Sequence, residues 1–347
     1  GVEVELIDKD PDWGVAGAGI TITGPSLRAL RDVGVLEDVT RDAYVGEGIC
    51  VRDTQGNHLY DLDTPMPEGC GVAGSGGITR PTLHKILASR IVEAGTSIRL
   101  GITVDGFTEA ADGVHVKLSD GSSERYDFVI GSDGLFSRVR DLIIPDAPKP
   151  EYTGQSAWRV TIPRPASIER RTYFLGGPLK VGFTPVSKDE MYMFVLESCP
   201  KMFRGPETLH TDLAKLLESY GGDVATVRDG LNANSQINFR PLEGFILPAP
   251  WYRGGVLLIG DGAHPTTPQL ASGAGMAIED AIVIAEELAR AESVDAAFAA
   301  FMARRIERCR LVTHSSVRIG QLEQQRAPVD EMTAVVRDAL AKLAEPI

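Results

Sequence analysis

The chain has 347 residues, 43% of them hydrophobic and 24% charged, with a formal net charge of -13 at pH 7. This is an ordinary globular composition, and the length suits two domains that share a continuous core. The acidic balance makes nucleic acid and anionic membranes unexpected partners, and no apolar run approaches the roughly 20 residues that cross a bilayer. Because no basic-then-apolar leader is present either, we expect a cytoplasmic protein, either a monomer or a homodimer.

Strands and helices alternate over the first part of the chain. In order, we expect a strand Val2–Ile7, a glycine-rich loop Gly14–Gly24, a helix Pro25–Val33, a hairpin of Ile49–Asp53 and His58–Leu62, an amphipathic helix Thr79–Glu93, and strands Val114–Leu118 and Phe128–Ile130. Short alternating strands, such as Lys180–Thr184 and Met191–Leu196, follow between about Glu151 and Arg240 and are interrupted by one helix, Leu209–Tyr220. The pattern thus changes from mixed α/β to mainly β near residue 151.

The α/β pattern returns after Pro241. A strand Gly255–Ile259, a loop and a helix Gly275–Arg290 come first, and mostly helical residues continue to Ile347. Segments of α/β type that flank a β-rich insert predict a nucleotide-binding domain whose sheet is completed by distant parts of the chain. We therefore expect an α/β fold: a Rossmann-like domain at 1–150 and 241–290, a β-sheet-rich substrate domain at 151–240, and a helical C-terminal region at 291–347.

Two strand ends carry acidic residues that suit a dinucleotide. Asp8 ends the first strand, where a carboxylate can accept hydrogen bonds from both ribose hydroxyls of an adenosine, although aspartate at a strand end is often only a turn former. Asp133 lies in a small glycine-rich turn after a second apolar strand, where the backbone can approach a ligand closely. A tight β-turn without any ligand explains the second pattern equally well.

The third pattern is the most specific. A buried strand delivers Asp261 to a loop that contains His264-Pro265, and Gly273-Ala274-Gly275-Met276 then opens a helix. Glycines at this position bring bare N–H groups and the positive end of a helix against a ligand that carries negative charge. A simple turn before a helix needs one glycine, so this series predicts a binding site.

With these motifs, the sequence resembles the FAD-dependent aromatic hydroxylases, single-component flavoprotein monooxygenases of the para-hydroxybenzoate hydroxylase type. The resemblance covers nearly the whole chain. It is carried by Gly17-Ala-Gly-Ile20 with Leu27-Arg28-Ala-Leu30, Arg80-Pro-Thr-Leu83-His-Lys-Ile-Leu87, Asp133-Gly134, Tyr152–Arg159 and the block Gly260–Ala281. It implies FAD as cofactor, NADH or NADPH as electron donor, and hydroxylation of a small aromatic or heteroaromatic substrate by O2 through a flavin C4a-hydroperoxide.

The resemblance also implies positions for the cofactor. The expected contacts are Asp8 with the adenosine ribose, Arg80 with the ribityl and phosphate region, Val104 with the adenine, Asp133 near the pyrophosphate, Asp261 with the ribityl-phosphate, Pro265 near the flavin ring, and Gly273, Ala274, Gly275 and Met276 at the carbonyl edge of the flavin. The family begins with a strand and a GxGxxG loop, and this sequence starts after both. We expect about thirty residues of the natural protein to precede Gly1.

Substrate residues are expected in the β-rich insert, because a hydroxylase needs polar groups that orient its substrate. The candidates, which alternate with apolar residues, are Tyr173, Tyr192, Gln236, Asn238 and Arg240. Each could equally be a surface residue of a strand or a satisfied core group. No catalytic residue is assigned, His264 is expected to be structural or adjacent to the flavin, and Arg304–Arg310 is expected to be a solvated helix face.

No metal is expected. The four cysteines (Cys50, Cys70, Cys199 and Cys309) include no CxxC, and the six histidines form no HxxxH or HExxH pair. Reduced, partly buried thiols are therefore expected.

Two other functions remain open at this point. One is a different flavin enzyme, a halogenase or a reductase. However, Trp158–Pro163 resembles only the edges of the WxWxIP motif of flavin halogenases, with Val160 at the place of the second tryptophan. The other is a non-catalytic binding protein that has lost FAD.

Overall fold

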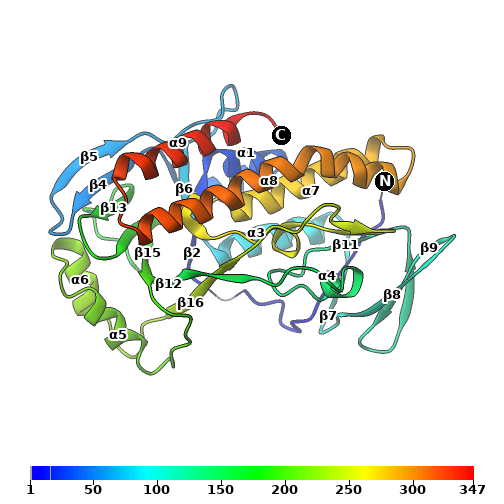
Figure 1. The fold of residues 1–347 in the computed structure, drawn as a ribbon, viewed down its shortest axis with the longest axis horizontal. Helices are drawn as coiled ribbons and strands as arrows, with labels where there is room; N and C mark the ends of the chain where they lie inside the picture. The colour runs from blue at the N-terminus through cyan, green and yellow to red at the C-terminus, as the bar shows by residue number, and fades with distance from the viewer. Residues whose placement is uncertain (1, 16) are drawn as a thin grey trace.

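The computed structural model describes residues 2–15 and 17–347 of the chain. Figure 1 shows the C-terminal helices α8 and α9 crossing the upper part of the molecule, with most strands below them and β4 and β5 at the upper left. The fold is of the expected α/β type, with a large sheet and a helical C-terminus. No helix within the described ranges is both long enough and apolar enough to cross a membrane.

Two parallel strand pairs lie in the part of the chain that the sequence predicts to be Rossmann-like. β1 (Glu5–Asp8) pairs with β7 (Ser97–Leu100), and β11 (Val129–Gly131) pairs with β18 (Val256–Leu258), which also carries the short antiparallel β17 (Tyr252–Arg253). The β11–β18 pair joins segments that lie far apart in the sequence. Since parallel strands end at the same edge of a sheet, the turns after β11 and β18 are neighbours.

The large sheet has seven strands in the order β16-β12-β15-β14-β13-β4-β5. Its strands are β12 (Glu151–Pro163), β13 (Arg171–Leu175), β14 (Lys180–Pro185), β15 (Glu190–Ser198), β16 (Ile237–Gly244), β4 (Ile49–Asp53) and β5 (His58–Leu62). The predicted hairpin β4–β5 thus belongs to the sheet of the 151–240 segment, which it joins by parallel pairing of β4 with β13. Nothing in the local pattern of residues 49–62 indicates this long-range pairing.

The helix predicted at Leu209–Tyr220 is wrong in extent. The structure has two helices, α5 (Leu209–Leu216) and α6 (Gly222–Gly230), which cover one face of the large sheet at the lower left of Figure 1. The helix is interrupted before Gly221-Gly222. Gly222 has a φ of +55°, a conformation that residues other than glycine seldom adopt.

The glycine-rich loop predicted at Gly14–Gly24 is wrong for its second half. Residues Gly19–Thr23 form β2, which pairs with β6 (Ser75–Thr79) in a three-stranded sheet completed by β3 (Tyr44–Gly46). Alternating β-branched residues favour a strand here, and the partner strand is close to the large sheet. A Cβ at Gly77 of β6 would lie 2.2 Å from the carbonyl oxygen of Pro185, so only glycine permits this approach.

The remaining elements surround these sheets. They are α1 (Gly24–Asp32), α2 (Leu36–Asp42), α3 (Arg80–Glu93), the meander β8 (Val104–Ala110), β9 (Gly113–Leu118) and β10 (Ser123–Tyr126), α4 (Arg138–Ile143), the 3-10 turns η1 (Gly260–Gly262) and η2 (Pro268–Leu270), α7 (Gly273–Arg290), α8 (Val294–Gln324) and α9 (Val329–Ala344). The long α8, orange in Figure 1, runs beside α7. In addition, α8 packs on α9, and α7 packs on α1.

Candidate active site

A cleft of about 290 Å³ lies where β2, the start of α7 and the large sheet meet. This volume is near the lower end for small-molecule sites. Six of the predicted site residues line the cleft: Arg80, Asp261, Gly273, Ala274, Tyr173 and Tyr192. Residues predicted as cofactor contacts and residues predicted as substrate contacts therefore share one cavity, with the first group on the α7 side and the second on the sheet.

Asp261 lies in the η1 turn, which follows β18 closely, and it lines the cleft. Burial raises the pKa of the Asp261 carboxyl, while the charges of His264 and Arg80 act in the opposite direction. Arg80 is the first residue of α3, and its guanidinium has no hydrogen bond or ion pair to any described residue. A cation without a protein partner fits a phosphate group, and a carboxylate in a hollow fits sugar hydroxyls.

The N-terminus of α7 is open. Ser272 at the N-cap makes no side-chain capping bond, and the first turn contains no acidic residue. The first N–H groups of an 18-residue helix are therefore available to an anionic or electron-rich ligand at Gly273 and Ala274, which line the cleft.

Gly275 and Met276 follow in the same helix but face inward. A Cβ at Gly275 would lie 2.1 Å from Ser26 Oγ, so this glycine allows α7 to pack against α1. Met276 is buried, and its carbonyl accepts a bond from Arg305. The predicted series of four residues therefore divides into two that border the cleft and two that pack the helix.

Four further predicted cofactor residues lie outside the cleft lining. Asp8 ends β1, and its Oδ1 accepts a bond from Asp10 N at 2.8 Å. Asp133 accepts bonds from the side chain of Ser137 and from the backbone N–H groups of Arg138 and Val139, so its carboxylate caps the start of α4. Val104 and Pro265 are buried.

Of the predicted substrate residues, only the two tyrosines border the cleft. The Tyr192 hydroxyl lies 2.6 Å from Thr21 Oγ1, which ties the sheet to β2. Gln236 and Arg240 are exposed and Asn238 is half-buried on β16, and none of the three is in the cleft lining.

The sequence reasoning missed Arg159, which also lines the cleft. Its neighbour Trp158 is fully buried among α5, α6 and the sheet, so alternation along β12 turns Arg159 to the opposite face. This alternation was available from the sequence. Burial lowers the pKa of Arg159, Tyr192 acts against that shift, and the positive charge of Arg80 adds to it.

Lys180 is the other cation that the prediction missed, and it differs from Arg159. Its Nζ lies 2.5 Å from Glu323 Oε1 of α8. Burial alone would lower the pKa of Lys180, but the charges of Glu323 and Tyr173 raise it. Lys180 is therefore neutralised by the protein, whereas no described carboxylate pairs with Arg159.

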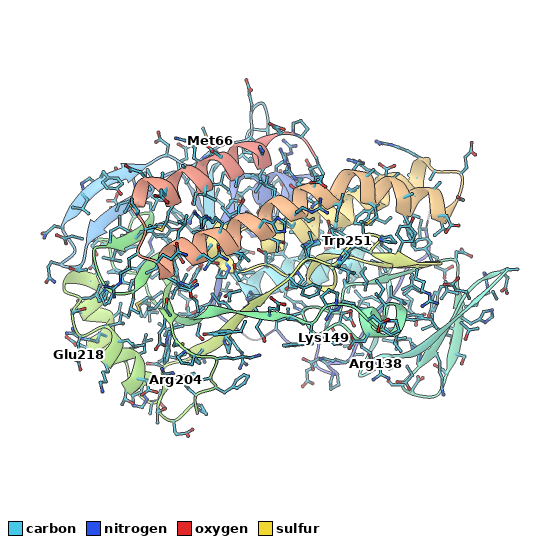
Figure 2. All side chains as sticks on the ribbon, viewed as in Figure 1. Met66, Arg138, Lys149, Arg204, Glu218 and Trp251 are labelled. Carbon is cyan, nitrogen blue, oxygen red and sulfur yellow. The ribbon has the colours of Figure 1, made fainter. Side chains whose placement is uncertain are left out.

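A buried ionic network supports the loop that carries Asp261. Asp280 of α7 accepts bonds from Gly260 N at 2.8 Å, His264 Nε2 at 2.6 Å and Arg305 Nε at 2.7 Å. Trp251, labelled in Figure 2, packs on the His264 ring with centroids 5.1 Å apart. The Asp280 carboxylate thus holds Gly260 and His264, the two ends of the loop that contains Asp261.

The prediction that Arg304–Arg310 is a solvated face is wrong. Arg305 is fully buried and bonds Glu279 as well as Asp280, and Arg308 also bonds Glu279. Arginines spaced along one helix have the same pattern whether they face water or buried carboxylates on a neighbouring helix, so local sequence could not distinguish the two.

Comparison with known proteins agrees with this geometry. The family model described as "FAD binding domain" matches residues 1–315. YetM of Bacillus subtilis (strain 168), which has a provisional name as an FAD-dependent monooxygenase, is 31% identical over 345 residues, or 97% of this chain and 93% of that protein. The 2-heptyl-3-hydroxy-4(1H)-quinolone synthase of Pseudomonas aeruginosa (strain UCBPP-PA14) is 29% identical over 94% of this chain and 85% of that protein.

Among solved structures, Klebsiella pneumoniae HpxO complexed with FAD and uric acid has the same fold. It superposes with a TM-score of 0.83 at 21% identity, over 99% of this chain and 93% of that chain. The matches cover almost the whole length of this chain and include the cleft and the network beneath it. This chain belongs to the FAD-binding-domain family and is an FAD-dependent monooxygenase, which takes its electrons from NAD(P)H.

Proposed function

We propose that this enzyme hydroxylates a small, planar aromatic or heteroaromatic substrate that carries an anionic group, with O2 as the oxidant. The observation that carries this proposal is the pairing of two walls in one cleft. On one wall lie Arg80, Asp261 and the open start of α7. On the other lie aromatic side chains and Arg159, which has no carboxylate partner among the described residues.

The first wall fits FAD. Arg80 would hold a phosphate, Asp261 the ribityl hydroxyls, and Gly273 and Ala274 the carbonyl edge of the flavin. When bound there, FAD supplies the redox chemistry that links NAD(P)H to O2. Asp8, Val104 and Asp133 would lie toward the adenosine and pyrophosphate end, and Pro265, Gly275 and Met276 would shape the loop and helix that hold the flavin. In this proposal, segments 1–150 and 241–290 form the FAD domain and 151–240 the substrate domain, to which the hairpin at 49–62 adds two strands.

The second wall fits a flat ring. Tyr173, Tyr192 and Phe194 present aromatic surface, and Leu196 and Leu242 extend it with apolar surface that excludes water. The Tyr192 hydroxyl and Thr21 add polar atoms at the edge where the two walls meet.

In this proposal, Arg159 makes the cleft selective for substrates that carry an anionic group. A desolvated guanidinium binds a carboxylate or an ionised ring hydroxyl through charge-assisted bonds that are about twice as strong as neutral ones. The P. aeruginosa relative is named for a hydroxylated quinolone, and the K. pneumoniae neighbour holds uric acid, so fused heteroaromatic rings are represented among similar proteins.

A paired substrate panel tests this function. Hydroxybenzoates and hydroxypyridine carboxylates would be compared with their amides, and substrate-stimulated oxidation of NADH and NADPH would be measured together with O2 consumption and product mass. The acids should stimulate turnover and gain one oxygen atom. Turnover on amides and neutral phenols alone would contradict the anionic substrate, and flavin-containing protein that no member of the panel stimulates would contradict the proposed function. Light scattering on the same protein would decide between the expected monomer and homodimer.

A further inference from the structure

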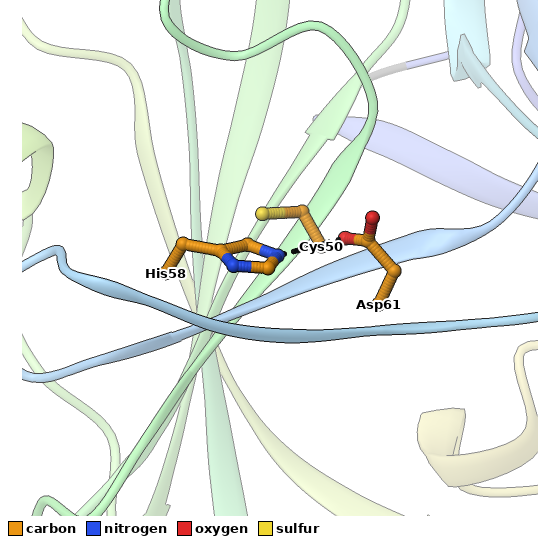
Figure 3. Close-up of side chains that lie close together, drawn as sticks. All are labelled: Cys50, His58 and Asp61. Carbon is orange, nitrogen blue, oxygen red and sulfur yellow. Dashed lines mark hydrogen bonds and ion pairs between the residues drawn. The ribbon is translucent and has the colours of Figure 1, made fainter.

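The β4–β5 hairpin brings together three side chains of different chemistry, none of which lines the cleft. Cys50 on β4 lies directly opposite Asp61 on β5, and His58 lies three residues before Asp61. Their ligand atoms, one sulfur, one imidazole nitrogen and one carboxylate oxygen, all lie within 4.8 Å of one another. Figure 3 shows the His58 ring turned toward Asp61 with the Cys50 sulfur beside it.

A β-bulge produces this arrangement. Residues three apart on a regular strand point to opposite faces, so His58 and Asp61 should be separated. The register shifts between Val51 and Arg52, which leaves one extra residue in β5 and returns His58 to the face of Asp61. The sequence shows no metal-ligand spacing because the ligands come from two strands and depend on this shift.

We propose that Cys50, His58 and Asp61 form a surface site for a thiophilic divalent cation, for which Zn²⁺ is the best match. Thiolate, imidazole and carboxylate are the three ligand types of zinc, and three protein ligands leave a fourth position for water. A thiolate and a carboxylate together balance the charge of the ion, and binding would release the thiol proton to solvent. This proposal is independent of the proposed substrate.

The surroundings permit the site. Asp61 Oδ1 bonds His58 Nε2 at 3.2 Å, and Asp61 Oδ2 lies 3.7 Å from Arg170. The Arg170 pair is exposed and therefore weak, and it uses the carboxylate oxygen that a cation would leave free. Cys50 is at least partly buried, whereas His58 and Asp61 are exposed, so an ion can reach the group from the side of the imidazole and the carboxylate.

Two other sets of neighbouring side chains show how the proposed site differs from ordinary ion pairs. His264, Asp280 and Cys309 are equally close, but Arg305 and Gly260 already bond that carboxylate, and the buried guanidinium would repel a cation. His115 and Asp112 form an exposed pair with the same sequence spacing and the same 3.2 Å distance as His58 and Asp61, but no cysteine joins them. Cys50 therefore distinguishes the proposed site from an ordinary surface pair.

A bound ion would cross-link β4 and β5 at the free edge of the seven-stranded sheet. Edge strands have unpaired backbone groups and few neighbours, so a cross-link there restrains the least supported part of the sheet. Saturation with Zn²⁺ should therefore raise the thermal midpoint of the protein.

Cobalt titration of the FAD-loaded protein without a histidine tag tests the proposal. We expect one Co²⁺ per chain, with ligand-field absorption beyond the flavin bands that indicates a four-coordinate ion, and displacement by Zn²⁺. Cys50→Ser should weaken binding at least about a hundredfold, whereas the control variants Cys70→Ser and His115→Ala should bind like the wild type. Binding that survives in Cys50→Ser, or that His115→Ala abolishes, would overturn the site.

A second measurement avoids any dependence on how the variants fold. Wild-type protein would be alkylated with and without Zn²⁺, and modification of each cysteine would be followed by mass spectrometry. Slower alkylation of Cys50 alone supports the site. Equal alkylation of Cys50 in both samples, at Zn²⁺ concentrations above those of the protein, contradicts it.

Discussion

The network beneath α7 and the cleft at its start use charge in opposite ways. In the network, Glu279 and Asp280 are fully buried, and each accepts bonds from charged partners. In the cleft, Arg80 and Arg159 have no carboxylate partner among the described residues, and Asp261 is only near charges that it does not bond. Paired charges fix the position of the loop, and unpaired charges remain available to ligands. The variants below test that division, beginning with the largest effect.

Asp280→Asn should have the largest effect, because it leaves the buried Arg305 guanidinium with one carboxylate fewer. Breaking a buried ion pair costs about 3–5 kcal/mol, and the single oxygen of asparagine cannot serve both Arg305 and the loop between Gly260 and His264. Urea unfolding at fixed FAD concentration measures the loss. Asp338→Asn removes an exposed partner of Arg337 and should change stability by less than about 0.5 kcal/mol. Equal losses in the two variants would refute the difference between buried and exposed pairs.

Arg159→Gln should raise KM for an acidic substrate about ten- to hundredfold, since a bond to a charged group contributes about 1.5–3 kcal/mol. The variant should still bind FAD, because Arg159 faces the substrate side. Steady-state kinetics on an acid and its amide measure the effect, and only the acid should lose affinity. Arg240→Gln is the matched control, an exposed arginine on the neighbouring strand β16 that should leave KM unchanged.

Asp261→Asn should weaken FAD on the order of tenfold, through loss of charged bonds to the sugar. It should also stabilise the FAD-free protein at neutral pH. The raised pKa of Asp261 means that ionising this carboxyl opposes folding, so the penalty is absent below its ordinary pKa and develops as pH rises through the raised value. Thermal midpoints of the FAD-free forms between pH 4 and 8 check the sign. If the variant is less stable at pH 8, Asp261 belongs to the structural network instead.

The His264–Asp280 pair should give a smaller effect in the same direction, a loss of stability as pH rises. Burial alone would lower the pKa of His264, but Cys309 and Asp280 raise it well above the usual value. Its contribution to stability is complete below about pH 6.5, and it is lost as pH rises through the raised value. His264→Gln should therefore flatten the alkaline decline of the thermal midpoint. An unchanged decline would mean that His264 does not titrate with folding.

Much of the α7 side of the cleft could be predicted from the sequence. Asp261 follows an apolar strand and Gly273 opens a helix, and both features are local consequences of strand and turn preferences. The hairpin at 49–62 was also predicted, but its place in the large sheet was not, because parallel pairing with β13 is a contact between distant segments. The roles of Asp8, Val104 and Asp133 with FAD stay predictions.

The sequence by itself determined the α/β class and the family, since periodicity, glycine turns and motif spacing are written in consecutive residues. Only the tertiary structure decided which charges have partners. Lys180 meets Glu323, Arg305 meets Asp280, and Arg159 meets no carboxylate in the described part of the chain, although all three are basic residues in regular elements. The physical reason is that pairing depends on side chains brought together by packing, over separations that no local pattern encodes.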